Sequence, residues 1–343
     1  MSDAAVKQDT VLVRPAGSFW GGETPVAVVV FLGLALLPLF AGGYPVYILP
    51  QYLLFGLLAL SLGLLWGFAG IVSFGQAAFF AFGGYAMGLV LQAGLGPEGT
   101  WLAIAAATLV GGLLAAISGY FLFSAGVRAT YFVLITLALS IIAEQVAVSQ
   151  SQITGGWNGM FVDRLSLGFG PLGEVALYQD VAAYYFVLPV VAAVYFAARA
   201  LTVARFGKIL VGIRENEDRM EALGYQPWVY KTVAFSLSGA IAGLAGGLYA
   251  SHSNFVSPSL AGVLFSTEVV VWVALGGRLS LFGALAGGVL VSALSNYLSS
   301  VAPQYWQLIV GLVFICVIVF FKQGLAGLFA DLAARVRPGR RNG

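Results

Sequence analysis

Residues 279–321 read LSLFGALAGGVLVSALSNYLSSVAPQYWQLIVGLVFICVIVFF, a stretch without a single Asp, Glu, Lys or Arg. A helix rises about 1.5 Å per residue and a bilayer core is about 30 Å thick, so one crossing needs about 20 residues. This stretch therefore holds more than one crossing. The same is true of residues 41–127, in which Glu98 is the only charged side chain. The sequence predicts a polytopic membrane protein.

The composition of the whole chain supports this interpretation. Of 343 residues, 60% are hydrophobic and 9% are charged, whereas a soluble domain has about 25% charged residues. The aromatic share of 14% argues against a disordered chain. One histidine and one cysteine cannot build a usual zinc site or an intrachain disulfide. The motifs HExxH and GxxxxGK[ST] are absent, so neither a zinc protease nor a self-contained ATPase is expected, and no catalytic or metal-binding residue is assigned.

We predict an all-α transmembrane bundle of about ten helices, with eight to ten as the range. The expected spans are 25–41, 46–66, 71–91, 100–124, 130–148, 181–200, 228–250, 261–274, 280–298 and 304–321. Two of them are irregular. The span 71–91 is interrupted by Ser73, Gly75 and Gln76, and 261–274 is short and contains Glu268. Broken or re-entrant helices are an open alternative at both places.

Basic residues orient the bundle, because cytoplasmic loops are enriched in Lys and Arg. They place both termini and the loop near residues 204–226 in the cytoplasm. The expected organisation is a cytoplasmic segment at 1–24, one transmembrane domain at 25–322 and a cytoplasmic tail at 323–343.

Glycines recur at four-residue spacing in the apolar segments, which lets helix backbones approach closely in lipid. They are expected to mark helix packing rather than solute contact. The clearest examples are Gly239, Gly243, Gly247, Gly283 and Gly287.

Few polar groups lie within the predicted spans. Glu268 is one of them, and a carboxylate there costs a few kcal/mol unless it is protonated, paired or facing a cavity. Structural pairing and a role in transport are both open for it. Ser73, Gln76 and Phe79, in the glycine-interrupted span, complete the candidate translocation pathway.

One loop concentrates the charge of the chain. Nine of the 27 residues from 205 to 231 are charged, with alternating sign. Apolar residues between them have roughly helical spacing, which predicts a single amphipathic helix that stops at Gly224. Such a helix suits docking into a groove of another protein, although an ordinary solvated loop is the alternative. The candidate docking residues are Arg214, Glu215, Glu217, Arg219, Glu221 and Gly224.

Several motifs of the chain occur in a consistent order. They are GIVSFGQAAFF at 70–80, TGGWNG at 154–159, GKILVGIRENE at 207–217, ALGY at 222–225, FSLSGAIAGLAGGLY at 235–249 and STE at 266–268. Together they resemble the permease subunits of bacterial ABC importers for branched-chain amino acids. The resemblance runs from about residue 50 to 328.

This resemblance implies partners and a location in the bacterial inner (plasma) membrane. The partners would be a second, homologous permease, two cytoplasmic ATPases, a periplasmic solute-binding protein and the lipid bilayer, but no nucleic acid. The loop at 204–226 would contact an ATPase. ATP and Mg would bind to the ATPases, and the chain itself would hold no cofactor and perform no covalent chemistry.

The solute is not decided by these motifs. The segment EVVVWVALGGR at 268–278 looks like the urea and short-chain amide branch of the family, whereas TGGWNG looks like the amino-acid branch. Many relatives carry histidine at the position of Gln76. An ion-coupled secondary transporter or a passive channel for a small neutral solute are the alternative functions.

Overall fold

The structure is a computed structural model, which describes residues 23–40, 42–127, 129–168, 174–177, 179–305, 308–309 and 311–312. Nine helices of this part form the body of the bundle. They are α1 (Thr24–Phe40), α2 (Tyr44–Leu64), α3 (Gln76–Gln92), α4 (Gly99–Ser124), α5 (Ala129–Ser149), α7 (Asp180–Val203), α10 (Pro227–Ser253), α11 (Val263–Gly276) and α12 (Leu281–Val301). This arrangement confirms the prediction of an all-α polytopic bundle.

Shorter elements connect these helices. They are the π-helical turn η1 (Leu65–Ala69), the helices α6 (Ser151–Thr154), α8 (Arg205–Glu215) and α9 (Glu217–Ala222), the 3-10 turns η2 (Gly156–Asn158) and η4 (Pro258–Ala261), and the strands β1 (Met160–Phe161), β2 (Ser166–Gly168), β3 (Glu174–Ala176) and β4 (Phe255–Val256). The strands form two small antiparallel pairs, β1 with β4 and β2 with β3.

Each of the first nine predicted spans coincides with a helix. Within the described residues, six helices are long and apolar enough to cross a membrane, and α1 and α11 are shorter apolar helices. The span expected at 71–91 begins late, because its first five residues are not helical and α3 starts at Gln76. The span at 304–321 and the terminal segments at 1–24 and 323–343 lie almost entirely outside the described residues.

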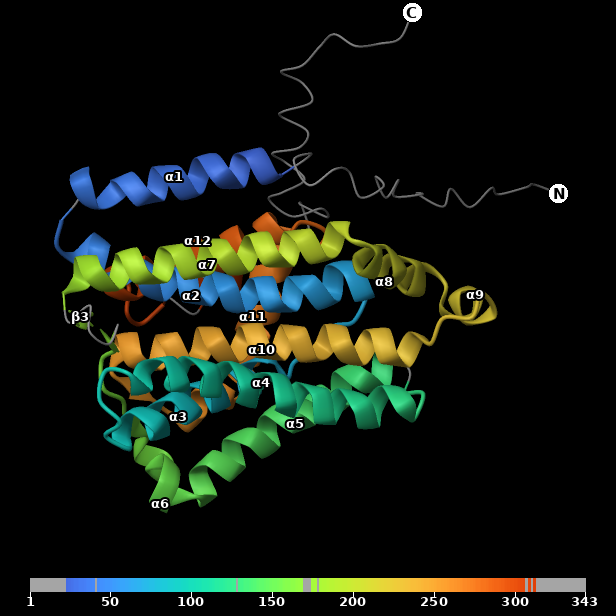
Figure 1. The fold of residues 1–343 in the computed structure, drawn as a ribbon, viewed down its shortest axis with the longest axis horizontal. Coiled ribbons are helices and arrows are strands. Elements are labelled where there is room, and N and C mark those ends of the chain that lie inside the picture. The colour runs from blue at the N-terminus through green and yellow to red at the C-terminus, as the bar shows by residue number, and fades with distance from the viewer. Residues whose placement is uncertain are drawn as a thin grey trace, which may run out of the picture.

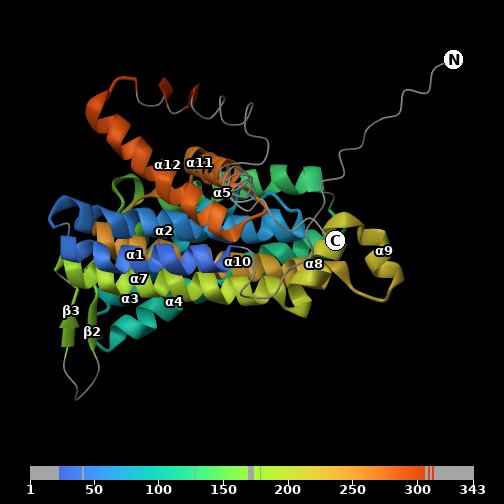
Figure 2. The same cartoon turned by 90° about the horizontal axis from the view of Figure 1, so that it is seen from above.

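The centre of the bundle is α2, which contacts α7, α10, α11 and α12. Figure 1 shows α7, α2, α10 and α4 running nearly parallel, with α1 along one edge. The helices α8 and α9 lie at one end of this stack and the strand β3 at the other. Seen from above, α12 crosses α2 at a tilt, and the hairpin of β2 and β3 projects from the end opposite α9 (Figure 2).

Close packing between α3, α4 and α10 depends on glycine. A Cβ added to Gly111 of α4 would meet the backbone of Gly239 and Gly243 of α10, and one added to Gly83 of α3 would also meet Gly243. Backbones that approach this closely gain van der Waals contact, which is a main source of helix association in lipid. A Cβ on Gly247 would meet a side chain of α4, and one on Gly287 would meet the backbone of α11. The backbone oxygen of Gly283 lies where a Cβ on Gly276 would go.

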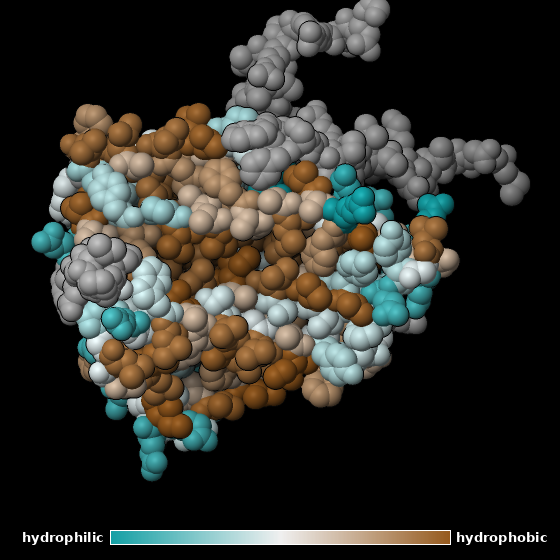
Figure 3. Space-filling model, viewed as in Figure 1, coloured by the Kyte–Doolittle hydropathy of each residue, from teal (hydrophilic) through white to brown (hydrophobic). Residues whose placement is uncertain are grey.

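The surface of the bundle is divided by polarity. Figure 3 shows apolar side chains across the middle of one face and hydrophilic ones gathered at the end that carries α8 and α9. An apolar middle between polar ends is expected of a body that crosses a bilayer.

Candidate functional site

The helical backbone is interrupted between α2 and α3. The π-helical turn η1 ends at Gly70, whose φ of 71° lies in the left-handed region. The backbone then stays non-helical until Gln76. Non-helical backbone at membrane depth is tolerated only where protein buries it or where it lines a cavity. This segment, residues 70–75, is called the break below.

Two side chains of α5 satisfy the backbone of the break. The amide of Phe74 donates to Thr136 Oγ1 at 3.1 Å, and its carbonyl oxygen accepts from Ser140 Oγ at 2.6 Å. Ser140 Oγ also lies 3.0 Å from Ser266 Oγ of α11. The break is therefore held by polar contacts from two neighbouring helices.

A polar cluster lies where the break meets α3. Ser61 Oγ of α2 donates to Gln76 Oε1 at 3.2 Å, and Ser238 Oγ of α10 donates to the Ser61 carbonyl oxygen at 2.5 Å. Ser238 lies well inside α10, and Ser61 precedes the end of α2 and the whole of η1, so α3 begins within the bundle and not at its end. Gln76 is 1% exposed, and its Nε2 has no hydrogen-bond partner among the described residues. An unpaired buried amide is unfavourable and rare in proteins.

Of the four predicted pathway residues, Gln76 belongs to this cluster, and Ser73 and Phe79 flank it in the chain. Ser73 Oγ accepts from the Gly75 amide at 3.1 Å, and the Phe79 ring lies 5.4 Å from the Phe235 ring of α10. Glu268 does not join them, since it lies exposed on α11. The structure thus places Ser73, Gln76 and Phe79 inside the bundle and Glu268 on its surface.

The charged loop contains two helices, which corrects the prediction of one. Asn216 separates α8 from α9 with an extended backbone, φ −159° and ψ 101°. Its side chain caps α9, because Oδ1 accepts from the Arg219 amide at 2.8 Å. An asparagine favours such a cap over a continuous helix. A Cβ on Gly212 of α8 would lie 2.8 Å from Met220 Sδ, so α9 folds back against α8.

Arg214 points into the bundle and not outward. Its Nη1 donates to the carbonyl oxygen of Gly67 in η1. The side chain also covers Gly70, where an added Cβ would lie 2.5 Å from Arg214 Cγ. Burial lowers the pKa of the guanidinium from its ordinary value, and the Glu215 carboxylate 3.8 Å away opposes this shift. Arg214 therefore joins α8 to the turn that precedes the break.

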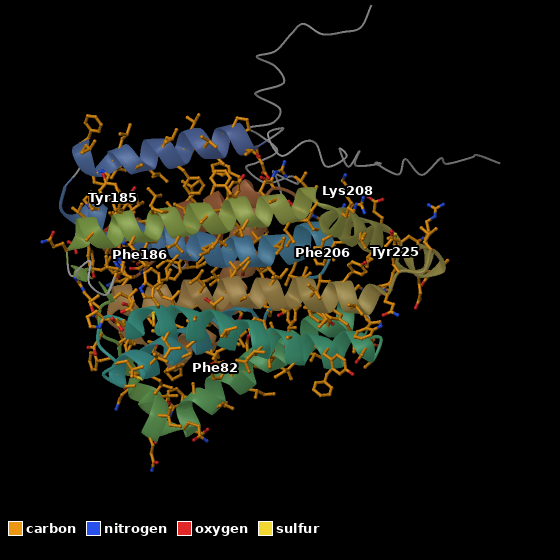
Figure 4. All side chains as sticks on the ribbon, viewed as in Figure 1. Phe82, Tyr185, Phe186, Phe206, Lys208 and Tyr225 are labelled. Atoms are coloured by element: carbon orange, nitrogen blue, oxygen red, sulfur yellow. The ribbon has the colours of Figure 1, made fainter. Side chains whose placement is uncertain are left out.

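The other docking candidates face away from the bundle. Glu215, Glu217, Arg219, Glu221 and Gly224 are exposed. Glu217 forms an ion pair with Lys231 of α10 at 2.5 Å, and Gly224 ends α9 with a φ of 87°. Figure 4 places Phe206, Lys208 and Tyr225 at this end of the bundle. Next to Gly224, the apolar side chain of Leu223 is 69% exposed, so charged and apolar groups share one outward surface.

Comparison with known proteins assigns the chain to a family. Residues 44–318 match the sequence profile of the branched-chain amino acid transport system / permease component family. The chain belongs to this permease family. Since the bundle is apolar as well, the permease is a multi-pass protein of the inner membrane.

Individual relatives of the permease differ in their named solutes. It is 28% identical to the high-affinity branched-chain amino acid transport system permease protein LivM of Escherichia coli K12, over 78% of this chain and 67% of that one. It is 26% identical to the nucleoside ABC transporter permease protein NupC of Lactococcus lactis, over 71% and 81%. A shorter match, 33% identical over 36% and 39%, is to the autoinducer 2 import system permease protein LsrC of Escherichia coli O9:H4. No solved structure matches the permease significantly.

Sequence reasoning missed the residues that support the break in this permease. Ser61, Thr136, Ser140 and Ser238 look like isolated hydroxyl residues in apolar helices. One signal was present, because Thr136 and Ser140 are four residues apart and so share a helix face. The partner of that face could not be inferred, since it is a non-helical segment more than 60 residues away in the chain.

Proposed function

We propose that the chain is the transmembrane permease subunit of an ATP-driven ABC importer. It would form the pathway together with a second, homologous permease, two cytoplasmic ATPases would drive it, and a periplasmic binding protein would deliver the solute. The membership of the permease family supports this proposal. The observation that carries it is the contact from α8 through Arg214 to Gly67, because it connects an outward surface to the break inside the bundle.

The solute that we propose is a branched-chain amino acid, in line with the names of the family and of LivM. Urea or a short-chain amide is the alternative. The different solutes named for the relatives indicate that the shared fold does not fix the solute. Fold and function are separable in this way in many families.

The outward surface of α8 and α9 would contact the ATPases on the cytoplasmic side. Exposed charges of both signs and the apolar side chains of Leu223 and Tyr225 are the groups that a helix presents to a groove. With α8 and α9 in the cytoplasm, both termini are cytoplasmic as well, flanking one transmembrane domain at 25–322. ATP and Mg would bind to the ATPases, and this chain would need no cofactor and carry out no covalent step.

Movement of α8 would reach the pathway through Arg214. Closure of the ATPases would displace α8, and Arg214 would transmit this displacement to η1 and the break. Ser73 lies within the break, and Gln76 and Phe79 follow it in α3, so their positions would change with it. Gln76 Nε2 would then find in another state the hydrogen-bond acceptor that it lacks among the residues described here.

Reconstitution of the full complex in vesicles tests the function. We expect uptake of L-leucine that requires ATP, the binding protein and both ATPases. Uptake by the permease alone along a proton or sodium gradient would instead identify a secondary transporter. Flux that needs no ATP and does not saturate would identify a channel.

Two sets of substitutions separate docking from transmission. The double variant Arg219→Glu with Glu221→Lys should lose co-purification of the ATPases, because both side chains are exposed on the docking surface. Arg214→Gln should retain the ATPases but lower the ratio of uptake to ATP hydrolysis about fivefold or more, the scale of a typical coupling energy.

A matched control is Asp163→Lys, which reverses an exposed charge at the opposite end of the bundle. It should leave ATPase co-purification unchanged. Retention of the ATPases by the double variant would show that the docking surface is wrongly assigned. An unchanged ratio of uptake to hydrolysis in Arg214→Gln would remove the role of Arg214 in transmission.

A further inference from the structure

One side of α11 is left open by the described residues and is called the α11 face below. It consists of Leu264, Thr267 and Glu268, which are exposed and share a side of the helix because they lie three and four positions apart. Leu264 is 83% exposed, and the Glu268 carboxylate has no ion pair or hydrogen bond with another described residue. Figure 2 shows α5, α11 and α12 on one side of the bundle and α4 on the opposite side.

The α11 face lies at membrane depth. Ser266, two residues before Glu268, has its Oγ 3.0 Å from Ser140 Oγ, near the middle of α5. Ser140 Oγ in turn donates to the Phe74 carbonyl oxygen in the break. Two residues of helix rise about 3 Å, so Glu268 lies close to the level of the break and far from either surface of the membrane.

The length of α11 also argues against a lipid-facing position. Its 14 residues rise about 21 Å, whereas the hydrocarbon core is about 30 Å thick. The turn η4 leads into α11 and contacts α3 and α5, with Pro258 and Ala261 buried. Non-helical backbone at membrane depth is found only where protein or water surrounds it. A cover of protein or water is therefore expected on this side of the bundle.

The outer side of α4 shows how a lipid-facing surface of the same protein differs. Leu109, Leu113 and Ile117 are exposed there, and α4 contains no charged residue. A carboxylate at membrane depth is costly in lipid, and such groups almost always face the interior of a bundle or a water-filled cavity. The α11 face resembles α4 in its exposed leucine but not in its carboxylate, so lipid does not suit it.

We propose that the second permease is seated on the α11 face, with Glu268 in a hydrated gap between the two subunits. A homologous bundle would place its own corresponding helix opposite α11, in the two-fold arrangement that is commonest among oligomers. Water in the gap would hydrate the carboxylate, which lipid cannot do. The gap would also lie next to the break, because Ser266 is one contact away from the residue that holds Phe74. The identity of the partner rests on the proposed function.

Photo-crosslinking in the full complex tests the surface. The photoreactive amino acid p-benzoyl-phenylalanine in place of Thr267 should join this chain to the second permease, which mass spectrometry of the product identifies. The matched control has the same group in place of Leu113, which is exposed on α4, and should give no product with the second permease. A product from Leu113 alone, or from neither position, would overturn the proposal. So would a product from Thr267 within the chain itself, because the expected span at 304–321 would then be the cover.

Alkylation tests the hydrated gap independently and does not require a bulky substituent. Cys316 is the only cysteine of the chain, so the background is Cys316→Ser. In that background, Glu268→Cys should react with a charged, membrane-impermeant maleimide about tenfold or more faster than Leu113→Cys, because the reactive thiolate forms in water and not in an apolar environment. Equal rates would show that Glu268 faces no water. If the permease with the photoreactive group does not fold, this comparison still decides whether lipid covers the α11 face.

Co-purification separates this proposal from the proposed function. If the second permease co-purifies with the ATPases and leucine uptake requires ATP, a failed crosslink from Thr267 removes the α11 face alone. If no second permease co-purifies with an active complex, the partner assigned under the proposed function is wrong.

Discussion

The helices α2 and α5 are equally apolar and are packed in opposite ways. Within the span Tyr44–Ala69, which joins α2 to η1, 78% of the most apolar window is buried inside the protein, compared with 28% in α5. Lipid tails are as apolar as leucine, so no hydrophobic force draws one apolar helix inward in preference to another. Hydropathy therefore identifies membrane helices here but does not identify the central one.

Small residues account for much of the difference. In α2, a Cβ on Gly56 or Gly63 would collide with α12, and this close approach supplies the contact that holds α2 in the centre. The buried face of α5 is narrow, with Phe132, Thr136 and Ser140 following one another at four-residue spacing. Two of these three residues are polar, so α5 is attached by hydrogen bonds where α2 is attached by packing.

The largest effect is expected from a side chain added at the α2–α12 crossing. In Gly56→Val, the new Cβ would lie 2.8 Å from the Leu285 carbonyl oxygen and 2.8 Å from Val289 Cγ2. Because backbone cannot move aside easily, we expect destabilisation of about 3 kcal/mol and a low folded yield. Gly33→Val in α1 is the control, since nothing lies within 4 Å of its Cβ. Equal yields by size-exclusion chromatography would contradict the central position of α2.

A smaller effect is expected from truncation of leucine in the two helices. Leu58 of α2 is fully buried, whereas Leu134 of α5 is 59% exposed. Leu58→Ala should lower the free energy of unfolding in SDS by about 2 kcal/mol, the low end of such truncations, because the reference state is also apolar in lipid. Leu134→Ala should change it by less than about 0.5 kcal/mol. A similar loss in both variants would mean that α5 is buried by another part of the protein.

The positions of the helices could be predicted from the sequence to a large extent. Charge-free stretches and glycine breaks located nine of them, because a bilayer imposes a minimum length on each helix. The irregularity of the span at 71–91 was also visible, since Ser73, Gly75 and Gln76 interrupt it. The place where helix resumes was not, because it depends on hydroxyl groups of α5 that meet the break only in the folded bundle.

The charged loop illustrates the same limit at the level of single residues. Its charge density marked it correctly as a region distinct from the spans, but spacing alone could not tell which charges face outward. Arg214 and Arg219 have the same chemistry, yet one contacts Gly67 inside the bundle and the other is exposed. The difference comes from the extended backbone at Asn216, which ends α8 and sends α9 in another direction. A continuous helix, as predicted from the periodicity, would not separate the two roles.

The smallest effect is expected from the hydrogen bonds that attach α5. Thr136→Val keeps the shape of the side chain but leaves the Phe74 amide without its acceptor. A hydrogen bond between membrane segments is worth about 1 kcal/mol, so the free energy of unfolding should fall by that amount. Amide exchange at Phe74 should become faster, because the break then opens more often. Thr130→Val, an exposed threonine on the same helix, should change neither quantity. Unchanged exchange at Phe74 in Thr136→Val would show that α5 is not what holds the break, and that the polar face of α5 serves another contact.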